Sequence, residues 1–452
     1  MHIAEINTMR VLILQFTDPT QDTPTPLFSH NIGVLCSCLK ERKFTASVVA
    51  LNGYQPGKLR AAMIENRPQY VLVDMPILSA TAARRTIADV AWQFALPVAV
   101  MGHYPTCQPS RAISIPGVSA LFLGEYERPA VDFLQDVRSQ FDSSGLQGVW
   151  LNTAEGLVKG APRPVETNLD SLPFPDRDVF DYGKIVAATG EAAFKAARGC
   201  ARWCGQCIND IYVDLHQETN NVRRRSVGNL LAEISDVIAR YEGVKRIRFY
   251  DHAFACDLAW LREFAARYRS SVSLPYSCYV PLEDVCAETA ELLASSGCNR
   301  VDTMIGSGSR FIRDEVQTIH VSNEQIIGGC ALLRQCGIDI FADVYVGLPY
   351  ETQITFEDTI NLVAKTQVRN IRPVIYYPLT GTRAADMCRE NGWVSGRGEE
   401  CYWRGRSVLD MPSLPARSIN DLAQKLPSML KRRRGLRIRQ WLSSVFSAPK
   451  NG

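Results

Sequence analysis

The chain has 452 residues, enough for two or three domains with large buried cores, because one domain takes roughly 100–200 residues. Apolar residues make up 46% and charged residues 21%, which excludes a disordered chain and collagen-like or low-complexity architectures. The formal net charge of +3 excludes a surface that is basic throughout, as whole-protein nucleic-acid binding would need.

Short β-branched runs alternate with amphipathic segments over residues 1–141. This alternation predicts a parallel sheet with helices on both faces, a doubly wound, Rossmann-like domain. Such domains bind ligands beyond the carboxyl ends of their strands, so we expect chemistry in the loops after Phe16, Met75 and Gly102. The expected strands lie at 11–16, 46–52, 70–75, 97–102 and 119–125, and the expected helices at 31–43, 81–94 and 127–141.

The following segment, residues 142–190, is rich in Ser, Gly and Pro and is predicted to be a linker. A second alternating region then spans residues 191–384 and predicts a partial (β/α)6 barrel with its active site at the carboxyl ends of the strands. Its expected strands lie at 192–197, 246–251, 273–280, 300–306, 338–347 and 371–378.

Several helix ends in this region are marked by capping residues. Asp257 is expected to cap a helix, Gly297 to end one, and Ser322 with Gln325 to form a capping box before a third. Residues 385–452 are expected to form a short helical extension with a basic run at 431–439. A solvated basic helix is the favoured interpretation of that run, and contact with a polyanion or acidic partner is the alternative.

Fourteen cysteines need an explanation, because neither a secretory h-region nor a run of ~18–20 apolar residues is present. We therefore expect a soluble, cytoplasmic chain with reduced thiols, in which clustered cysteines indicate metal or redox chemistry. Core packing is expected for Cys36, Cys38, Cys330 and Cys336. A catalytic role is kept open for one of Cys256, Cys278 and Cys298, near predicted strand ends.

Cys200, Cys204 and Cys207 stand apart, in the run RGCARWCGQC. The C-x3-C-x2-C spacing lets one short loop direct three thiolates at one metal centre, and soft thiolates select zinc or iron–sulfur clusters. Zinc normally takes four closed ligands, and the nearest candidate for a fourth is His216. A zinc knuckle or three unrelated core thiols remain the alternatives.

This motif at the start of a (β/α)6 region resembles the radical S-adenosylmethionine (SAM) superfamily. The resemblance implies that the three cysteines hold a [4Fe–4S] cluster whose fourth iron binds SAM. The family usually has an aromatic residue between the second and third cysteines, whereas this chain has Gly205 and Gln206 there, with Trp203 just before.

Three further segments resemble the same superfamily and imply SAM contacts. YDHAF at 250–254 places Asp251 as the contact to the amino group of SAM, and residues 297–309 place Ser307 near its ribose. The run GLPYET implies contacts at Gly347 and Leu348. Gly306 replaces an expected Glu and Tyr350 an expected Gly, so the usual homolytic cleavage does not follow from the resemblance alone. Ordinary Gly-rich turn chemistry is the alternative for each segment.

The N-terminal half of the chain shows a second, independent family resemblance. Residues 101–127 and 170–178 resemble the region that follows the corrinoid-binding domain in cobalamin-dependent radical SAM enzymes, where GG-x-HPT and GEGE occur. Met101 and Tyr126 depart from those motifs. Cobalamin contacts are thereby implied at Gly102, His103 and Glu125, and Ser79 and Thr81 after the third strand could hydrogen-bond its nucleotide tail. His103 and His252 are also candidates for acid or base chemistry.

The sequence says less about which side chain binds the cobalt of cobalamin. Corrinoid domains that supply a histidine use D-x-H-x-x-G after the first strand. Here His30 and Gly33 fit that pattern, but Phe28 stands in place of the Asp. An imidazole without its carboxylate partner is poorly oriented, so His30 or no side chain at all is expected on the lower face of the cobalt.

The resemblance implies an enzyme that carries a [4Fe–4S] cluster, SAM and cobalamin. We expect a methyltransferase that moves a methyl group from SAM through methylcobalamin to an unactivated carbon of a small metabolite or natural product, after a deoxyadenosyl radical removes a hydrogen atom. One alternative is rearrangement, ring contraction or oxidative cyclisation without methyl transfer, and another is a non-catalytic corrinoid or iron–sulfur carrier or sensor.

The expected partners are a small-molecule substrate and an external electron donor of the flavodoxin or ferredoxin type. The chain is expected to be a monomer with no membrane span. Nucleic acid is disfavoured as a partner because only the tail is basic.

Overall fold

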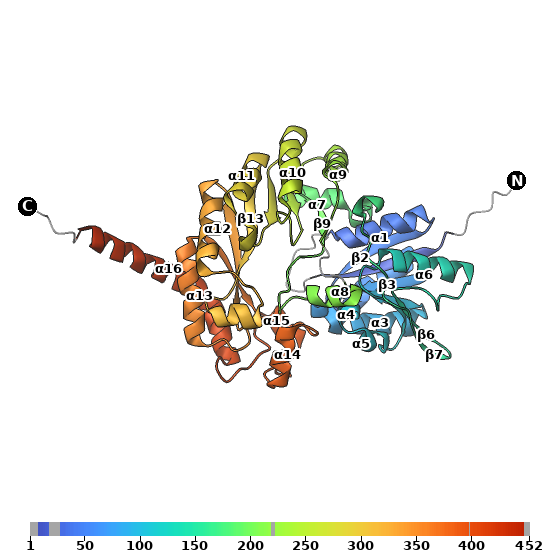
Figure 1. Ribbon diagram of the computed structural model, residues 1–452. Coiled ribbons are helices and arrows are strands. Elements are labelled where there is room, and N and C mark those ends of the chain that lie inside the picture. The colour runs from blue at the N-terminus through green and yellow to red at the C-terminus, as the bar shows by residue number, and fades with distance from the viewer. Residues whose placement is uncertain (1–7, 18–27, 218–221, 397, 447–452) are drawn as a thin grey trace, which may run out of the picture. The chain divides into compact units, whose positions relative to one another are not determined.

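A computed structural model describes residues 8–17, 28–217, 222–396 and 398–446, with side chains described as far as residue 435. The described residues form two compact units, one within residues 1–201 and 208–248 and the other within 202–207 and 249–452 (Figure 1). The division passes through the cysteine loop, because residues 202–207 belong to the second unit.

The first unit is built on a seven-stranded sheet in the order β2-β1-β3-β4-β5-β6-β7. Its first five strands pair in parallel, which confirms the doubly wound fold predicted from the alternating pattern. β1 runs Leu12, Ile13 and Leu14 through the core without exposure, as expected for a strand covered on both faces. The elements are β1 (Arg10–Thr17), α1 (His30–Glu41), β2 (Thr45–Asn52), α2 (Pro56–Asn66), β3 (Tyr70–Asp74), α3 (Ala80–Phe94), β4 (Val98–Met101), α4 (His103–Cys107), α5 (Pro109–Ile113), β5 (Val118–Phe122) and α6 (Glu127–Ser139).

The predicted linker at 142–190 has more regular structure than expected. Strands β6 (Val149–Thr153) and β7 (Gly156–Lys159) extend the first sheet as an antiparallel hairpin, with Leu151 opposite Ala120 of β5. A hairpin this short gains most of its stability from the sheet edge that it joins, which local composition does not reveal. The remaining prolines of the segment, up to Pro175, lead into helix α7 (Tyr182–Thr189).

Further elements complete the first unit. β9 (Ala197–Arg198) and β10 (Arg223–Arg224) form a small antiparallel pair on either side of α8 (Asn209–His216). The expected strands at 192–197 and 246–251 form as β8 (Glu191–Phe194) and β11 (Arg246–Phe249), with helix α9 (Val227–Arg240) between them.

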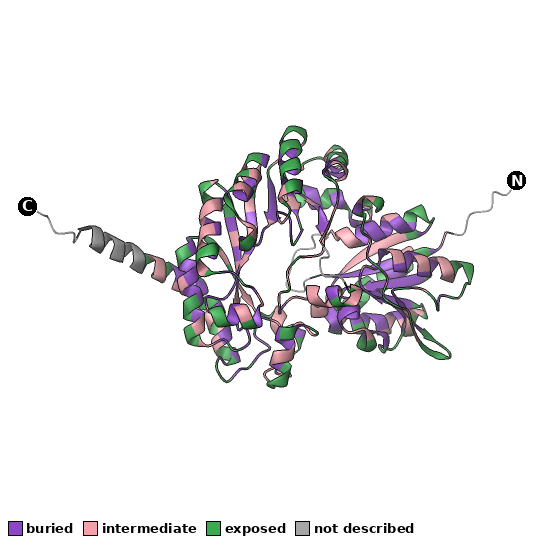
Figure 2. Cartoon of the chain, in the orientation of Figure 1, coloured by how far each residue is buried: buried purple, intermediate pink, exposed green. Residues whose placement is uncertain are grey.

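The second unit contains the four remaining expected strands, which pair in parallel in chain order. Figure 2 shows its strands largely buried and the outer faces of its helices exposed. The strands are β12 (Tyr276–Tyr279), β13 (Cys298–Ile305), β14 (Asp339–Val346) and β15 (Asn370–Ile375). The helices are α10 (Leu258–Ser271), the 3₁₀ turn Leu282–Asp284, α11 (Ala287–Ser296), the π-helical turn Ile312–Val316, α12 (Asn323–Gln335), α13 (Gln353–Thr366), α14 (Arg383–Glu390), α15 (Glu399–Trp403) and α16 (Ala416–Phe446).

The predicted capping residues lie where the sequence indicated. Asp257 accepts a hydrogen bond from the Trp260 amide at 3.0 Å and begins α10. Ser322 and Gln325 form both bonds of the capping box of α12, and Gly297 adopts the left-handed conformation that ends α11. The basic tail is helical as expected, within α16. Within the described part of the chain, no helix is long and apolar enough to cross a membrane.

Candidate functional site

The carboxyl edge of the first sheet brings Gly102 against Asp74. Gly102 follows β4 with a φ of +98°, and a Cβ at this position would lie 2.3 Å from Oδ1 of Asp74, so a larger residue would displace the carboxyl. Burial raises the pKa of Asp74, the last residue of β3, to about 7. A carboxyl group that titrates near neutrality therefore lies at the predicted ligand-binding edge. The sequence analysis missed Asp74, although a polar residue that ends an apolar strand was the available signal.

His103, the first residue of α4, is exposed, and its Nδ1 lies 3.0 Å from the hydroxyl of Tyr212 on α8. Burial raises the pKa of the Tyr212 phenol above its usual range. On the same helix, His216 lies against Gly124, where a Cβ would be 2.7 Å from its Nε2. The helix that follows the cysteine loop thus lies over this edge of the first sheet, a contact that the sequence analysis did not predict.

Glu125 is engaged by protein partners. Its carboxylate lies 2.5 Å from Nη2 of Arg223 and 3.2 Å from Nη1 of Arg198, and Arg198 also pairs with Glu127 at 2.6 Å. Burial alone would raise the pKa of Glu125, but the hydrogen bond from Arg223 and the charges of both arginines lower it. The carboxylate that we expected to contact a cofactor therefore ties the β9–β10 pair to the first sheet.

The remaining candidates of this unit differ in accessibility. Ser79 is buried at the start of α3, whereas Thr81, two residues later, is exposed. His30, the first residue of α1, lines a pocket beneath the proline-rich segment 172–175.

The cysteine loop is shared by the two units, with Cys200 in the first and Cys204 and Cys207 in the second. All three thiols are reduced and partly exposed. The Cys200 carbonyl accepts a hydrogen bond from Nδ2 of Asn209 at 3.2 Å, and the Cys207 amide donates to the Cys204 carbonyl at 2.7 Å. Among the described residues, no three His, Cys, Asp or Glu side chains converge closely enough to hold a metal ion.

Gly205 anchors this loop to the second unit. Its N–H donates to the Gln317 carbonyl at 3.0 Å and to Oγ1 of Thr318 at 2.9 Å, and its carbonyl accepts from the Ala384 amide at 2.8 Å. A Cβ at residue 205 would lie 2.5 Å from the carbonyl oxygen of Val316. Glycine is therefore required between the second and third cysteines.

Two side chains of the same loop are also held within the second unit. Arg202 pairs with Glu283 at 2.7 Å and with Asp284 at 2.5 Å. Gln206 is buried, where the family usually has an aromatic residue, and its Nε2 lies 3.9 Å from Sδ of Met304 on β13. These contacts hold the loop against β13 and the 3₁₀ turn Leu282–Asp284 of the second unit.

Ser307 follows β13 and is buried. Its amide donates to Oε1 of Gln317 at 2.9 Å, and its hydroxyl lies 3.4 Å from Oγ1 of Thr359 and accepts from the Ser309 amide at 3.2 Å. A Cβ at Gly306 would lie 3.1 Å from Oε1 of Gln317, so the glutamine amide approaches the position of the missing family glutamate. Gln317 was not found by the sequence analysis, because no motif marks it.

The segment after β14 forms a turn closed by a buried acid. The Gly347 amide donates to Oε2 of Glu351 at 2.6 Å, and Leu348 is fully buried. Burial raises the pKa of Glu351 to about 8, so this carboxyl holds a proton at neutral pH. A Cβ at Gly347 would lie 2.8 Å from Ile419 of α16, which shows why a glycine is needed in this turn.

The other candidates of the second unit divide between the two ends of its sheet. Asp251 is buried just after β11, and the His252 ring lies edge-on to Tyr279 at 6.4 Å between centroids. Cys298 begins β13, at the amino end of that strand, and its Sγ lies 3.9 Å from Sγ of Cys278. Both thiols are buried, which favours packing over catalysis for this pair.

Residues 195–363 match the family described as the Radical SAM superfamily. Among curated proteins, an uncharacterized methyltransferase of Pyrococcus horikoshii is 22% identical over 313 residues, which cover 69% of this chain and 66% of that protein. A tRNA-2-methylthio-N(6)-dimethylallyladenosine synthase of Yersinia enterocolitica is 29% identical over 51% of this chain and 49% of its own length. The chain thus spans 66% of the first relative and 49% of the second.

Solved structures match nearly the whole chain. The radical SAM methyltransferase TsrM from Kitasatospora setae, with tryptophan substrate and a SAM analogue bound, has a TM-score of 0.67 and 18% identity over 93% of this chain and 83% of its own. The cobalamin-dependent radical SAM enzyme OxsB, with aqua-cobalamin and SAM bound, has a TM-score of 0.68 and 14% identity over 94% of this chain and 56% of its own. Residues 195–363 therefore form a radical SAM domain, and the chain as a whole has the fold of the cobalamin-binding radical SAM proteins.

Proposed function

We propose that this chain is a cobalamin-dependent radical SAM methyltransferase that methylates an unactivated carbon of a small molecule. The observation that carries the proposal is the three-cysteine loop at the start of the radical SAM domain, in a chain that shares its fold with TsrM over 93% of its length. The thiol donors suit an iron–sulfur cluster, because soft thiolates are its usual ligands.

The proposed roles follow the two units. Cys200, Cys204 and Cys207 would hold the cluster, and the loop contacts of Gly205 and Arg202 would orient the second and third thiols. When bound, the cluster, SAM and cobalamin supply the radical and methyl-transfer chemistry that side chains lack.

The other candidates would bind the two organic cofactors. The proposed SAM contacts are Asp251, Ser307, Gly347 and Leu348, all near the ends of strands in the barrel region. The proposed corrinoid contacts are Ser79, Thr81, Gly102, His103 and Glu125, at the edge where a sheet of order 2-1-3-4-5 binds its ligands. Of this set, Glu125 would act through backbone atoms or by holding Arg198 and Arg223, because its carboxylate is already paired.

The proposal is tested by anaerobic purification, reconstitution with iron, sulfide and cobalamin, and incubation with SAM and a reductant. We expect bound cobalamin, an iron–sulfur absorption band, and S-adenosylhomocysteine or deoxyadenosine as products. Cys204→Ala should lose the band and both products. Cys336→Ala, the same change at the end of α12, should keep them. Absence of cobalamin and of both products from the wild-type protein would refute the proposal.

A second candidate is a cobalamin-dependent radical reaction without methyl transfer. The shared fold with OxsB, which is described as a cobalamin-dependent S-adenosylmethionine radical enzyme, over 94% of this chain supports keeping it. Product analysis separates the two candidates, because methyl transfer yields S-adenosylhomocysteine, whereas a rearrangement yields deoxyadenosine alone.

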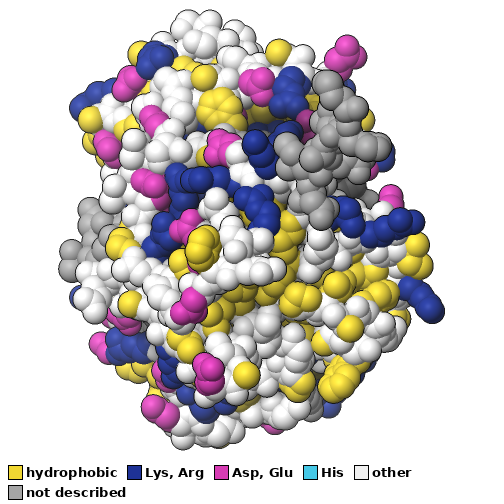
Figure 3. Space-filling view, turned by 90° about the vertical axis from the view of Figure 1, so that its right-hand side faces the viewer, with side chains coloured by type: hydrophobic (Ala, Val, Ile, Leu, Met, Phe, Trp, Pro, Cys, Tyr) yellow, Lys and Arg dark blue, Asp and Glu magenta, His cyan; other side chains and the backbone are white. Residues whose placement is uncertain are grey.

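A small-molecule substrate is favoured over nucleic acid by the charge pattern. On the face drawn in Figure 3, Lys and Arg side chains lie among Asp and Glu side chains, as the net charge of +3 leads one to expect. We also propose an external flavodoxin or ferredoxin as electron donor and a monomeric state. Analytical ultracentrifugation and reduction by purified flavodoxin test these two points.

A further inference from the structure

The start of α1 and the proline-rich segment enclose a pocket within the first unit. It is lined by His30 and Val34 of α1, by Leu172–Pro175, and by Lys195, Arg198 and Arg225. The proline-rich segment packs closely against the helix, where the Asp176 amide donates to the Gly33 carbonyl at 2.9 Å. Ser37 donates to the Phe174 carbonyl at 2.6 Å, and a Cβ at Gly33 would lie 2.7 Å from Cβ of Pro175.

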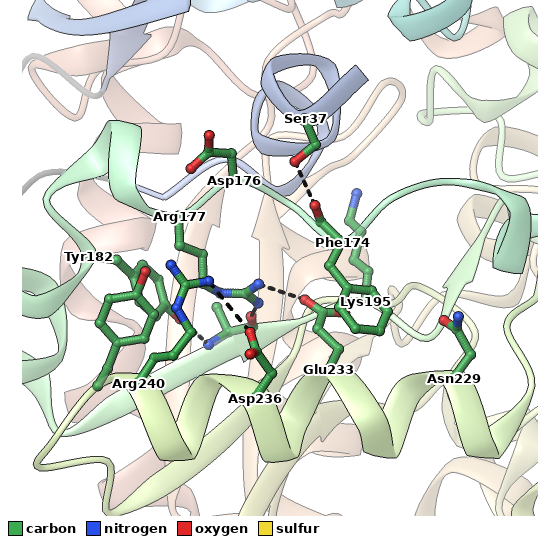
Figure 4. A network of polar contacts seen from close by, with 12 residues as sticks. Ser37, Phe174, Asp176, Arg177, Tyr182, Lys195, Asn229, Glu233, Asp236 and Arg240 are labelled. Carbon is green, nitrogen blue, oxygen red and sulfur yellow. Dashed lines mark hydrogen bonds and ion pairs between the residues drawn. The ribbon is translucent and has the colours of Figure 1, made fainter. Parts of the chain in front are cut away.

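The charges that line this pocket are all positive. The described residues that line it include three cations and no acidic side chain. Arg198 is neutralised by Glu125 and Glu127 outside the lining. Arg225 shares the buried carboxylate of Glu233 with Arg177. Figure 4 shows Arg177 paired with Glu233. Lys195, Arg225, Arg177 and Arg198 all place positive charge near the His30 ring.

His30 provides a second, independent observation. Both of its ring nitrogens are buried, and neither has a hydrogen-bond partner among the described residues. A neutral imidazole carries one N–H donor and one acceptor nitrogen, and leaving both unpaired in a protein interior is unfavourable. The groups whose charges act on the ring are cations, namely Lys195, Arg225, Arg177 and Arg198. A metal cation at this imidazole would be repelled, whereas an anion would be attracted.

The amino end of α1 adds to the positive electrostatic potential at His30. The helix has 12 residues, its first turn contains no acidic side chain, and Ser29 caps it by accepting from the Ile32 amide. The positive end of the helix dipole therefore lies at His30, with no carboxylate in the described first turn of the helix. Helix amino ends of this kind bind phosphate groups in many proteins.

We propose that this pocket binds a phosphate group, held by Lys195 and the His30 imidazole at the amino end of α1, with Arg225 contributing positive charge. A phosphate group suits His30 because a phosphate oxygen, in either a free phosphate or a phosphodiester, accepts a hydrogen bond from one ring N–H. The phosphate group has two possible sources, free inorganic phosphate and the phosphodiester in the nucleotide tail of cobalamin. This inference needs neither the iron–sulfur cluster nor SAM.

The first test measures binding of inorganic phosphate to the full chain by isothermal titration calorimetry, with chloride at equal ionic strength as the reference. We expect saturable binding that Lys195→Met weakens at least tenfold and that His30→Phe also weakens. Lys184→Met is the matched control, because Lys184 lies on α7 of the same unit with its side chain 75% exposed. Absence of phosphate binding by the wild-type protein, or equal loss in the Lys195 and Lys184 variants, would overturn the free-phosphate source.

The second test separates the two sources by comparing cobalamin with cobinamide, which lacks the nucleotide tail. If the phosphodiester occupies the pocket, Lys195→Met should weaken cobalamin binding at least tenfold and leave cobinamide binding unchanged. If only free phosphate binds, neither corrinoid should be affected. The proposal is wrong if phosphate does not bind and both corrinoids respond equally, and circular dichroism of each variant identifies a folding defect.

Discussion

The amide of Gly205 donates a hydrogen bond to the carbonyl of Gln317 at 3.0 Å, and this contact joins the middle of the cysteine loop to the segment after β13. Gln317 in turn accepts the Ser307 amide through its side chain. One residue thus contacts both the loop proposed to hold the cluster and the strand end proposed to hold the ribose of SAM. The geometry of the two proposed sites is coupled through this residue.

Replacement of Gly205 by Ala should lower cluster incorporation. The added Cβ would lie 2.5 Å from the Val316 carbonyl oxygen, so the loop must shift and carry Cys204 and Cys207 with it. We expect a several-fold loss of iron and sulfide per chain after reconstitution. Gly328→Ala is the control, since a Cβ there meets no atom within 4 Å. Full cluster content in Gly205→Ala would contradict the positioning role.

Removal of the Arg202 side chain should loosen the same loop. Arg202 pairs with Glu283 at 2.7 Å and Asp284 at 2.5 Å in a partly buried setting. We expect Arg202→Met to bind the cluster but to lose it faster on exposure to air, measured as the decay of its absorption band. Arg262→Met, which breaks an exposed pair with Glu288, should decay like the wild-type protein. Identical decay in both variants would argue against this role.

Glu233→Gln should destabilise the first unit strongly. Glu233 is fully buried between Arg177 and Arg225, and loss of its charge removes a shared counter-ion from two buried guanidiniums. Breaking such a buried pair costs about 3–5 kcal/mol of unfolding free energy. Asp236→Asn on the same helix removes an exposed pair with Arg240 and should cost less than about 1 kcal/mol. Urea denaturation measures both values, and similar costs would disprove the proposed difference.

Glu351 should make stability fall as the pH rises toward 8. Burial raises its pKa in the folded protein to about 8 from an ordinary value of 4.5, so the native state keeps a proton that the unfolded chain releases between these values. Each pH unit in that window removes about 1.4 kcal/mol from this group's contribution.

Glu351→Gln keeps the shape of the protonated acid and should flatten this dependence. We expect it to match the wild-type unfolding free energy near pH 5 and to exceed it at pH 8. Glu357→Gln, an exposed position on α13, is the control and should follow the wild-type curve. Parallel curves for Glu351→Gln and the wild type would show that Glu351 does not carry the effect.

The sequence by itself determined both fold classes and most element positions. Local signals sufficed there, because apolar periodicity reports which face is buried and caps such as Asp257, Ser322 and Gly297 act within a few residues. It also singled out Cys200, Cys204 and Cys207, because a metal-binding loop carries its ligands in one short run.

Only the tertiary structure revealed the partners of these elements. The β6–β7 hairpin depends on the free edge of β5, and Glu125 proved to be paired with arginines nearly 75 and 100 positions away. Asp74 and Gln317 gain their importance from Gly102 and Gly205, which no local pattern links to them. The pocket at His30 likewise gathers residues from α1, the proline-rich segment and β9. Periodicity and spacing describe a residue's neighbours along the chain, whereas charge pairing and burial depend on residues that folding brings together from distant positions.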